Sequence, residues 1–198
     1  KALERTYLRD INTEFKDNKA QFAKRLNFMT RANNISENFI KKFPITEQNI
    51  DSILEGINGD PPYLSLQVTF DPSSSSIKSL TNSPSFNIIG NLKLKKLIIE
   101  WSDLVLDYKE EESLANQVSE EIMQFHLNTT SLNYKFEGIL SKDDKIKLEK
   151  LIYWKAERLG VIVDTTVYRI GERESDKVMA AIDTIIALTE PYTLNKNQ

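Results

Sequence analysis

One helical periodicity over the first 43 residues constrains this chain more than any other feature. Apolar side chains recur there mostly at steps of three, four or seven residues: Leu8, Ile11, Phe15, Phe22, Leu26, Met29, Ile40 and Phe43. Asn18 and Asn33 interrupt this stripe, and the first proline is Pro44, where the helix has to stop. A helix over residues 1–43 would be about 60 Å long at about 1.5 Å per residue. That length is typical of helical bundles and coiled coils.

The helical pattern is already present at the first residue, and no start signal precedes it. The chain begins with Lys1, without Met, and no capping Ser, Thr, Asp or Asn stands before the first apolar positions. A trimmed or frayed terminus accounts for this pattern. A helix that continued upstream in the native protein accounts for it equally well.

Two further long helices are expected, over residues 91–128 and 141–190. Their apolar stripes include Leu94, Leu97, Trp101, Leu104, Tyr108, Ile122 and Phe125 in the first, and Ile152, Leu159, Val163, Val178, Ile185 and Leu188 in the second. Ser141 followed by Asp144 has the spacing of a capping box. Gly160 and Gly171 fall inside the last stripe, which crosses both, so we expect one helix there, bent at most.

The region between the first two long helices, residues 44–90, is expected to hold short helices and an irregular strap. A short helix surrounds Ile53, an apolar extended arm reaches Phe70, and a second short helix, capped by a serine, contains Ile77 and Leu80. The connection over 58–90 is otherwise irregular. The sequence therefore predicts an all-α fold, an elongated antiparallel helical bundle of three long helices that forms a single domain over 1–198.

Composition excludes several classes of protein. Of 198 residues, 40% are apolar and 28% charged, the net charge is -3, and the basic residues are mixed with acidic ones, which argues against nucleic-acid binding. No apolar run reaches the roughly 18 residues that a membrane span needs. The chain has no cysteine, so disulfides, thiol nucleophiles and thiolate metal sites are excluded.

Motifs that would carry chemistry are missing from the sequence. The one histidine is His126, and Met123 stands where a Glu-x-x-His metal motif would need its glutamate. There is no Gly-x-Ser-x-Gly elbow, and the six glycines are too scattered for a phosphate-binding loop. We therefore expect no catalytic residues, no cofactor and no metal site.

The best candidate for a binding site is the segment over residues 63–89, together with the helix that follows it. Long irregular loops often carry function, and this one combines aromatic with polar side chains. The candidate residues are Tyr63, Phe70, Asp71, Phe86, Trp101 and Tyr108. The alternative is that these aromatic rings only cap one end of the bundle. Trp101 shares the stripe of its helix and is expected to be buried.

Three blocks of this region resemble a family of uncharacterised bacterial single-pass membrane proteins, a domain-of-unknown-function family. The blocks are FDPSSSSIKSL at 70–80, FNII at 86–89 and LIIEWSDLVLDY at 97–108. The likeness covers most of the chain at low identity outside these blocks. The chain departs from the family at residues 82–86, NSPSF, where a Ser-Ser-Gly-like turn is usual.

The resemblance implies a membrane span upstream of Lys1 and places this domain on the periplasmic side of the inner membrane, in the cell envelope. It supplies no activity and no ligand. We therefore expect a non-enzymatic module that senses a small ligand or contacts a protein, with a homo-oligomer among the partners to consider. The alternatives are a cytoplasmic coiled-coil-like scaffold and an enzyme whose site is not recognised.

Overall fold

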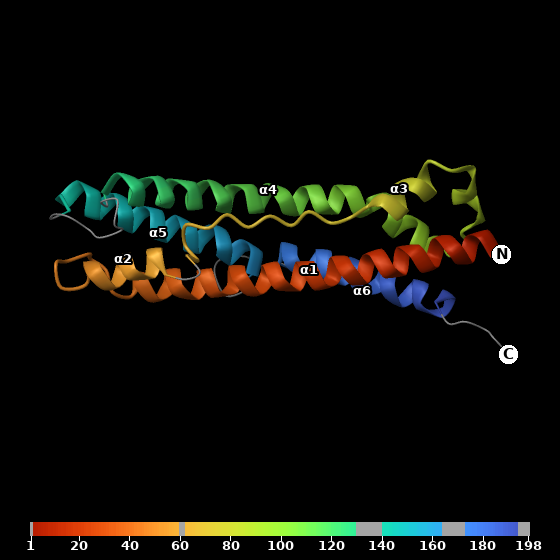
Figure 1. Cartoon of the computed structure of the whole chain (residues 1–198), viewed down its shortest axis with the longest axis horizontal. Helices are drawn as coiled ribbons and strands as arrows, with labels where there is room; N and C mark the ends of the chain where they lie inside the picture. The colour runs from red at the N-terminus through yellow and green to blue at the C-terminus, as the bar shows by residue number, and fades with distance from the viewer. Residues whose placement is uncertain (1, 60–61, 130–139, 164–172, 194–198) are drawn as a thin grey trace. The chain divides into compact units, whose positions relative to one another are not determined.

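Helices are the only regular elements in the part of the chain that the computed structural model describes, residues 2–59, 62–129, 140–163 and 173–193 (Figure 1). In chain order they are α1 (Ala2–Ile40), α2 (Ile50–Asn58), α3 (Ser75–Thr81), the 3₁₀ helix η1 (Pro84–Ile88), α4 (Leu92–Thr129), α5 (Lys142–Val163), α6 (Glu174–Thr189) and the 3₁₀ helix η2 (Glu190–Tyr192). The all-α fold predicted from the sequence is confirmed.

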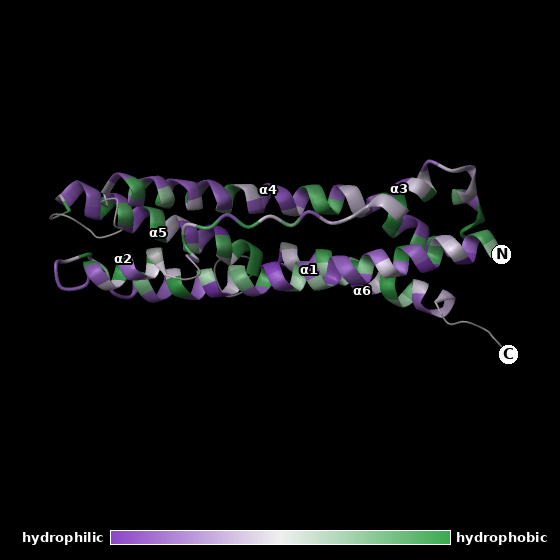
Figure 2. Ribbon diagram, viewed as in Figure 1, coloured by the Kyte–Doolittle hydropathy of each residue, from purple (hydrophilic) through white to green (hydrophobic). Residues whose placement is uncertain are grey.

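The first two long helices have nearly the predicted bounds. The helix expected over 1–43 is α1, which ends at Ile40, shortly before Pro44, and the helix expected over 91–128 is α4. Along both helices hydrophobic and hydrophilic residues alternate (Figure 2), as expected of amphipathic helices. Periodicity locates such helices well because it records which face of each turn is buried.

The single helix predicted over 141–190 is corrected to two. Helix α5 ends at Val163, α6 begins at Glu174, and Arg173 is described outside any helix. The apolar stripe suggested one helix because both helices bury a face, and a stripe does not record whether the backbone is continuous. The β-branched run at the end of α5, Val161 to Val163, lowers helix propensity where the first helix stops.

The predicted capping box at the start of the last region is confirmed. The Ser141 hydroxyl accepts a hydrogen bond from the Asp144 N–H at 3.1 Å and donates to the Asp144 carboxylate at 2.7 Å. Aspartate thus replaces the glutamate that is usual at this position. Helix α5 begins directly after Ser141.

The chain divides into two compact units, and α1 and α4 contribute to both. Unit 1 comprises Lys1–Lys24, Phe70–Lys109 and Glu174–Gln198, and unit 2 comprises Arg25–Thr69 and Glu110–Arg173. The single domain expected over 1–198 stays a prediction. Each unit is described below by itself.

In unit 1, α1 and α4 pack through aromatic side chains and run parallel. The ring centroids of Phe15 and Trp101 lie 4.8 Å apart, and those of Phe22 and Tyr108 lie 5.2 Å apart. Residue numbers therefore rise together along the two helices. A parallel pair needs a long connection in place of a short turn, and residues 41–91 supply it.

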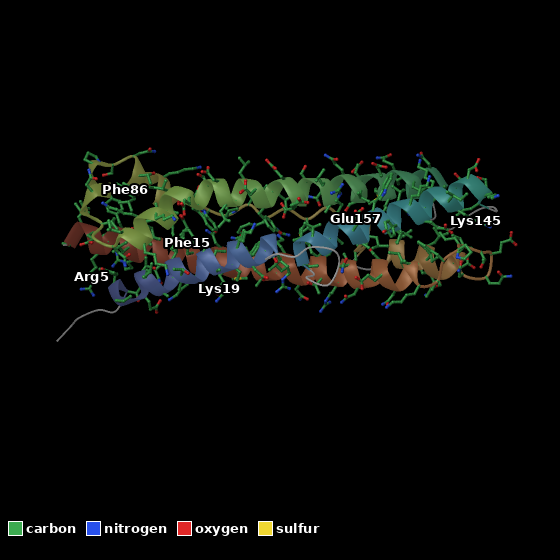
Figure 3. All side chains as sticks on the ribbon, turned by 180° about the vertical axis from the view of Figure 1, so that it is seen from behind. Arg5, Phe15, Lys19, Phe86, Lys145 and Glu157 are labelled. Carbon is green, nitrogen blue, oxygen red and sulfur yellow. The ribbon has the colours of Figure 1, made fainter. Side chains whose placement is uncertain are left out.

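Helix α6 runs antiparallel to α1 in the same unit. Two ion pairs join them, from Lys19 to Asp183 at 2.7 Å and from Lys16 to Glu190 at 2.8 Å (Figure 3 labels Lys19). Between these pairs and the N-terminus, the buried Asn12 amide donates to the Thr189 hydroxyl at 2.9 Å. The surface ion pairs contribute little stability individually, but the buried amide fixes the register of α6.

Unit 2 has a large hydrophobic core drawn mainly from α1, α2, α4 and α5. Its buried members include Phe39, Ile50, Ile53, Leu54, Ile57, Leu64, Ile122, Phe125, Leu148, Leu151 and Ile152. Gly56 is required here, since a Cβ at this position would collide with the Phe39 ring. The extended segment before Phe70 joins this core through Leu64, as the predicted apolar strap requires.

A lysine is buried in unit 2. Lys155 on α5 is 3% exposed, and its ammonium donates to the Ala115 carbonyl at 3.1 Å and to the Ser119 hydroxyl. Burial lowers its pKa to about 8. The buried Glu112 lies on the same face of α4, one turn before Ala115.

We expect Lys155→Met to stabilise the protein by about 2–3 kcal/mol at pH 7, because the folded state then no longer buries this ammonium group. The gain is full below about pH 8 and shrinks as pH rises toward 10.5, the ordinary value of the unfolded chain. Urea unfolding at pH 7 and pH 9.5 measures it. Lys147→Met, at an exposed position on the same helix, is the control. An equal effect of both substitutions would contradict the prediction.

Candidate functional site

The site is built on the segment over residues 70–81, which a buried carboxylate of α1 holds in place. The Glu14 carboxylate accepts hydrogen bonds from the Ser75 hydroxyl at 2.6 Å, the Ser76 N–H at 2.9 Å and the Ser73 hydroxyl at 3.1 Å. Ser74, at the N-cap position of α3, makes no capping hydrogen bond of its own. Glu14 therefore caps α3 from another helix.

The electrostatics of Glu14 agree with this role. Burial by itself would raise the pKa of this carboxyl, but the hydrogen bonds from Ser75, Ser76 and Ser73 outweigh burial and lower the pKa below its ordinary value. The ionised form is thus the one that the folded protein prefers.

One turn further along α1, the Asn18 amide pairs with the backbone of the same segment. Its oxygen accepts from the Ser73 N–H at 2.9 Å, and its nitrogen donates to the Ser73 carbonyl at 2.8 Å. A side-chain amide thus completes both hydrogen bonds that a neighbouring strand would otherwise make. Together Glu14 and Asn18 fix the position of the segment that enters α3.

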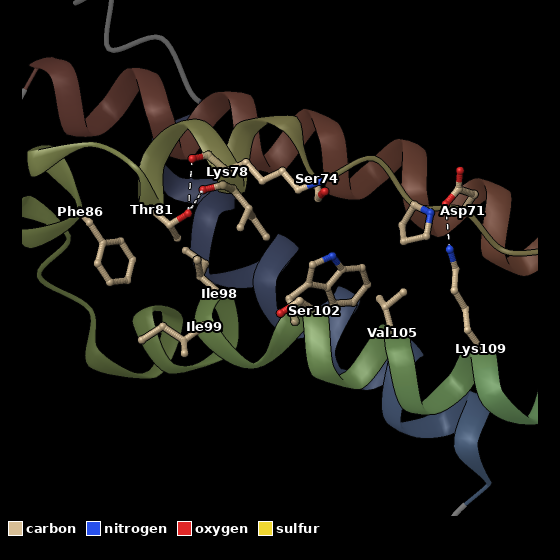
Figure 4. A pocket seen from close by; sticks show the side chains of 13 residues that line it. Asp71, Ser74, Lys78, Thr81, Phe86, Ile98, Ile99, Ser102, Val105 and Lys109 are labelled. Carbon is tan, nitrogen blue, oxygen red and sulfur yellow. Dashed lines mark hydrogen bonds and ion pairs between the residues drawn. The ribbon is translucent and has the colours of Figure 1, made fainter.

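A pocket of about 620 Å³ opens between this segment, η1 and α4 (Figure 4). It is lined by Asp71, Pro72, Ser74, Ile77, Lys78, Thr81, Phe86, Ile98, Ile99, Trp101, Ser102, Val105 and Lys109. All of these residues belong to unit 1. The volume is within the range of about 300–1,000 Å³ that small-molecule sites occupy.

The charged groups of the pocket gather around Asp71. Its carboxylate accepts from Lys109 at 2.8 Å, and this hydrogen bond, with the charge of the lysine, lowers the pKa of Asp71. In Figure 4 the Lys78 side chain extends from α3 towards Ser74, and its charge also favours the ionised form of Asp71. Two ammonium groups and one carboxylate leave this pocket with a net positive charge.

The apolar part of the pocket lies between α3 and α4. Trp101, Ile98, Ile99 and Val105 supply it from α4, and Phe86 supplies it from η1. Trp101 is 2% exposed, so it lines the pocket while most of its surface packs in the core, as the sequence predicted for it. A ligand with an apolar body and a polar end would match this lining.

The six residues proposed from the sequence do not all meet. Asp71, Phe86 and Trp101 line the pocket. Phe70 and Tyr108 are buried, each in ring contact with Phe22, at centroid distances of 4.6 Å and 5.2 Å. These two rings therefore belong to the aromatic core of unit 1 and do not line the pocket.

Tyr63 belongs to unit 2, apart from this set. Its ring centroid lies 4.8 Å from that of Phe28, and its hydroxyl accepts from Arg31 at 3.0 Å. A sequence window cannot show that the extended segment leaves one unit and enters the other between Thr69 and Phe70.

Sequence reasoning missed the residues that position and charge the site. Glu14 and Asn18 did carry a signal, since polar side chains on the buried stripe of a helix need partners. Nothing in the sequence marked Lys78 and Lys109 as site residues, because a lysine on an amphipathic helix is usually an ordinary solvated residue.

Other chemistry in the described part of the chain is limited. His126 is buried on α4, and burial lowers its pKa. Within the described ranges, no three His, Cys, Asp or Glu side chains are grouped as a metal site would require. No described helix is long and apolar enough to cross a membrane. Comparison with protein-family models, with curated proteins and with solved structures gives no match.

The role of Glu14 can be tested by pH. We expect Glu14→Ala to cost about 1–3 kcal/mol at pH 7, because the donors of Ser75 and Ser76 lose their acceptor. Since the folded pKa of Glu14 is lowered, its contribution is present above the unfolded value near 4.5 and is lost as pH falls through the folded value. Urea unfolding between pH 7 and pH 3 measures it. Asp17→Ala, exposed on the same helix, should change neither stability nor its pH dependence.

Proposed function

We propose that unit 1 is a non-enzymatic binding module that takes a small amphipathic ligand with an anionic end. The observation that carries this proposal is the pocket of about 620 Å³, which joins an apolar wall to a positively charged rim. The apolar body of the ligand would lie on Trp101, Ile98 and Val105. Its anionic end would pair with Lys78.

Lys78 is the more suitable of the two lysines for the anionic group. Lys109 already makes an ion pair with Asp71, whereas the structure gives Lys78 no ion pair among the described residues. The hydroxyl of Ser74, towards which Lys78 extends, could add a hydrogen bond to the same group (Figure 4). Lys78 is exposed to solvent, so it is free to donate a charge-assisted hydrogen bond to an anionic group, which a neutral or cationic ligand would lack.

The proposal includes a place in the cell. The resemblance of residues 70–108 to a membrane-anchored family favours a ligand-sensing or interaction module on the periplasmic side of the inner membrane. The gene sequence upstream of Lys1 tests this part directly. An apolar run of about 20 residues there would support it, and a charged run without a span would favour the scaffold alternative.

Binding can be followed through Trp101. The chain has two tryptophans, and the other, Trp154, is 46% exposed in unit 2. In the variant Trp154→Phe, tryptophan emission reports on the pocket alone. We expect decanoate, an alkyl carboxylate, to change this emission in a saturable way, because its chain would lie against the indole ring.

The matched comparison is Lys78→Ala in the same background. It should weaken decanoate binding by about tenfold, as expected for one charge-assisted contact of about 1.4 kcal/mol, and should leave the weaker binding of decanol unchanged. Lys147→Ala, an exposed lysine of unit 2, is the control. Emission that does not respond to decanoate, or an equal response in the Lys78→Ala variant, would contradict the proposed site.

A further inference from the structure

Helix α4 carries a row of exposed apolar side chains opposite its buried face. Leu92, Ile99 and Leu106 follow one another at steps of seven residues and are 79%, 60% and 60% exposed. Seven residues are nearly two helical turns, so the three side chains form one stripe along the helix. Single exposed apolar residues are ordinary, but an aligned row of three on one helix is typical of a contact surface.

Charged side chains along one side of this stripe are sorted by sign. Lys93 and Lys96 stand one and four residues after Leu92, at its N-terminal end. Glu100 and Asp103 stand one and four residues after Ile99, and Asp107 stands one residue after Leu106. Within the helix, the Lys96 ammonium already lies 3.7 Å from the Glu100 carboxylate in an exposed ion pair. Positions one and four after a stripe residue lie on the same side of a helix. That side therefore changes from basic to acidic along the stripe.

We propose that this stripe docks against the same stripe of a second copy of the chain, with the two α4 helices antiparallel and Ile99 facing Ile99. The sorting of charge favours this partner. Lys96 lies three residues before Ile99 and Asp103 four residues after it, so in the antiparallel pair they come to nearly the same height, about 1.5 Å apart along the axis. Leu92 then faces Leu106 of the second copy.

A parallel pair lacks this match. Its two-fold axis runs along the helices, so the charged sides of the two copies lie on opposite edges of the contact, and Lys96 stays about 10.5 Å from Asp103 along the axis. The antiparallel pair makes the contact between Lys96 and Asp103 twice, because its two-fold axis lies across the helices. Leu92 and Leu106 do not line the pocket, whereas Ile99 does, so the stripe and the proposed ligand site share one side chain.

The chain lacks cysteine, which allows a geometric test by disulfide formation in the whole chain. Ile99→Cys places a thiol at the two-fold axis, so mild oxidation should give a covalent dimer. Leu92→Cys should not cross-link alone, because it faces Leu106, but Leu92→Cys and Leu106→Cys mixed together should. Cross-linking of Leu92→Cys with itself, as efficient as that of Ile99→Cys, would overturn the antiparallel arrangement.

Sedimentation velocity of the unmodified chain tests the association itself. One stripe is smaller than the roughly 1,200–2,000 Å² of a stable interface, so we expect a weak, concentration-dependent dimer. Lys96→Glu and Asp103→Lys should each weaken it several-fold, and the double variant should restore it, since the charges are exchanged. Leu127→Glu, at an exposed apolar position of α4 in unit 2, should have no effect.

Two results would overturn the proposal. The first is a chain that remains monomeric up to about 500 µM, beyond the range of weak specific contacts. The second is a dimer that survives Ile99→Glu or Leu106→Glu, each checked by circular dichroism for an unchanged helix content. Both positions are exposed, so these variants keep the core of unit 1 intact.

Discussion

Unit 1 depends on the buried carboxylate of Glu14. Among the described residues no strand lies beside the segment that leads into α3, and α3 has no side-chain cap of its own, so the backbone donors there need an acceptor from elsewhere. Glu14 supplies it through Ser75, Ser76 and Ser73. This attachment sets one wall of the pocket, because the lining residues Ser74, Ile77 and Lys78 lie between or directly after the serines that bind Glu14.

The same solution appears in both units, with an asparagine in each. In unit 1 the Asn18 amide pairs with the N–H and carbonyl of Ser73, and in unit 2 the Asn116 amide pairs with the N–H and carbonyl of Val68, at 3.0 Å and 2.9 Å. An isolated extended segment is not stable by itself, because its backbone groups lack a ladder. A side-chain amide carries one donor and one acceptor side by side and can replace the missing strand at a single residue.

Much of the fold could be predicted from the sequence because burial on a helix is a local, periodic property. The periodicity of apolar residues located α1 and α4, and the spacing of Ser141 and Asp144 located the start of α5. The periodicity could not show that the stripe over 141–190 belongs to two helices. The partners of Glu14 lie about 60 residues away along the chain, and no local pattern encodes that pairing. Asp71, Phe86 and Trp101, three of the six residues chosen from the sequence, line one pocket, but the lysines that give it charge were not distinguishable from solvated ones.

Helix α4 presents three different surfaces within unit 1. Tyr108 and most of Trp101 face the core, Ser102 and Val105 face the pocket, and Leu92 and Leu106 face outward. Ile99 belongs to two of them, because it lines the pocket and stands at the centre of the exposed stripe. If a ligand fills the pocket and a second copy covers the stripe, both of them contact this one side chain. The free energies of ligand binding and self-association are then coupled. Because such coupling is reciprocal, the factor by which the ligand changes the affinity of self-association equals the factor by which self-association changes the affinity for the ligand.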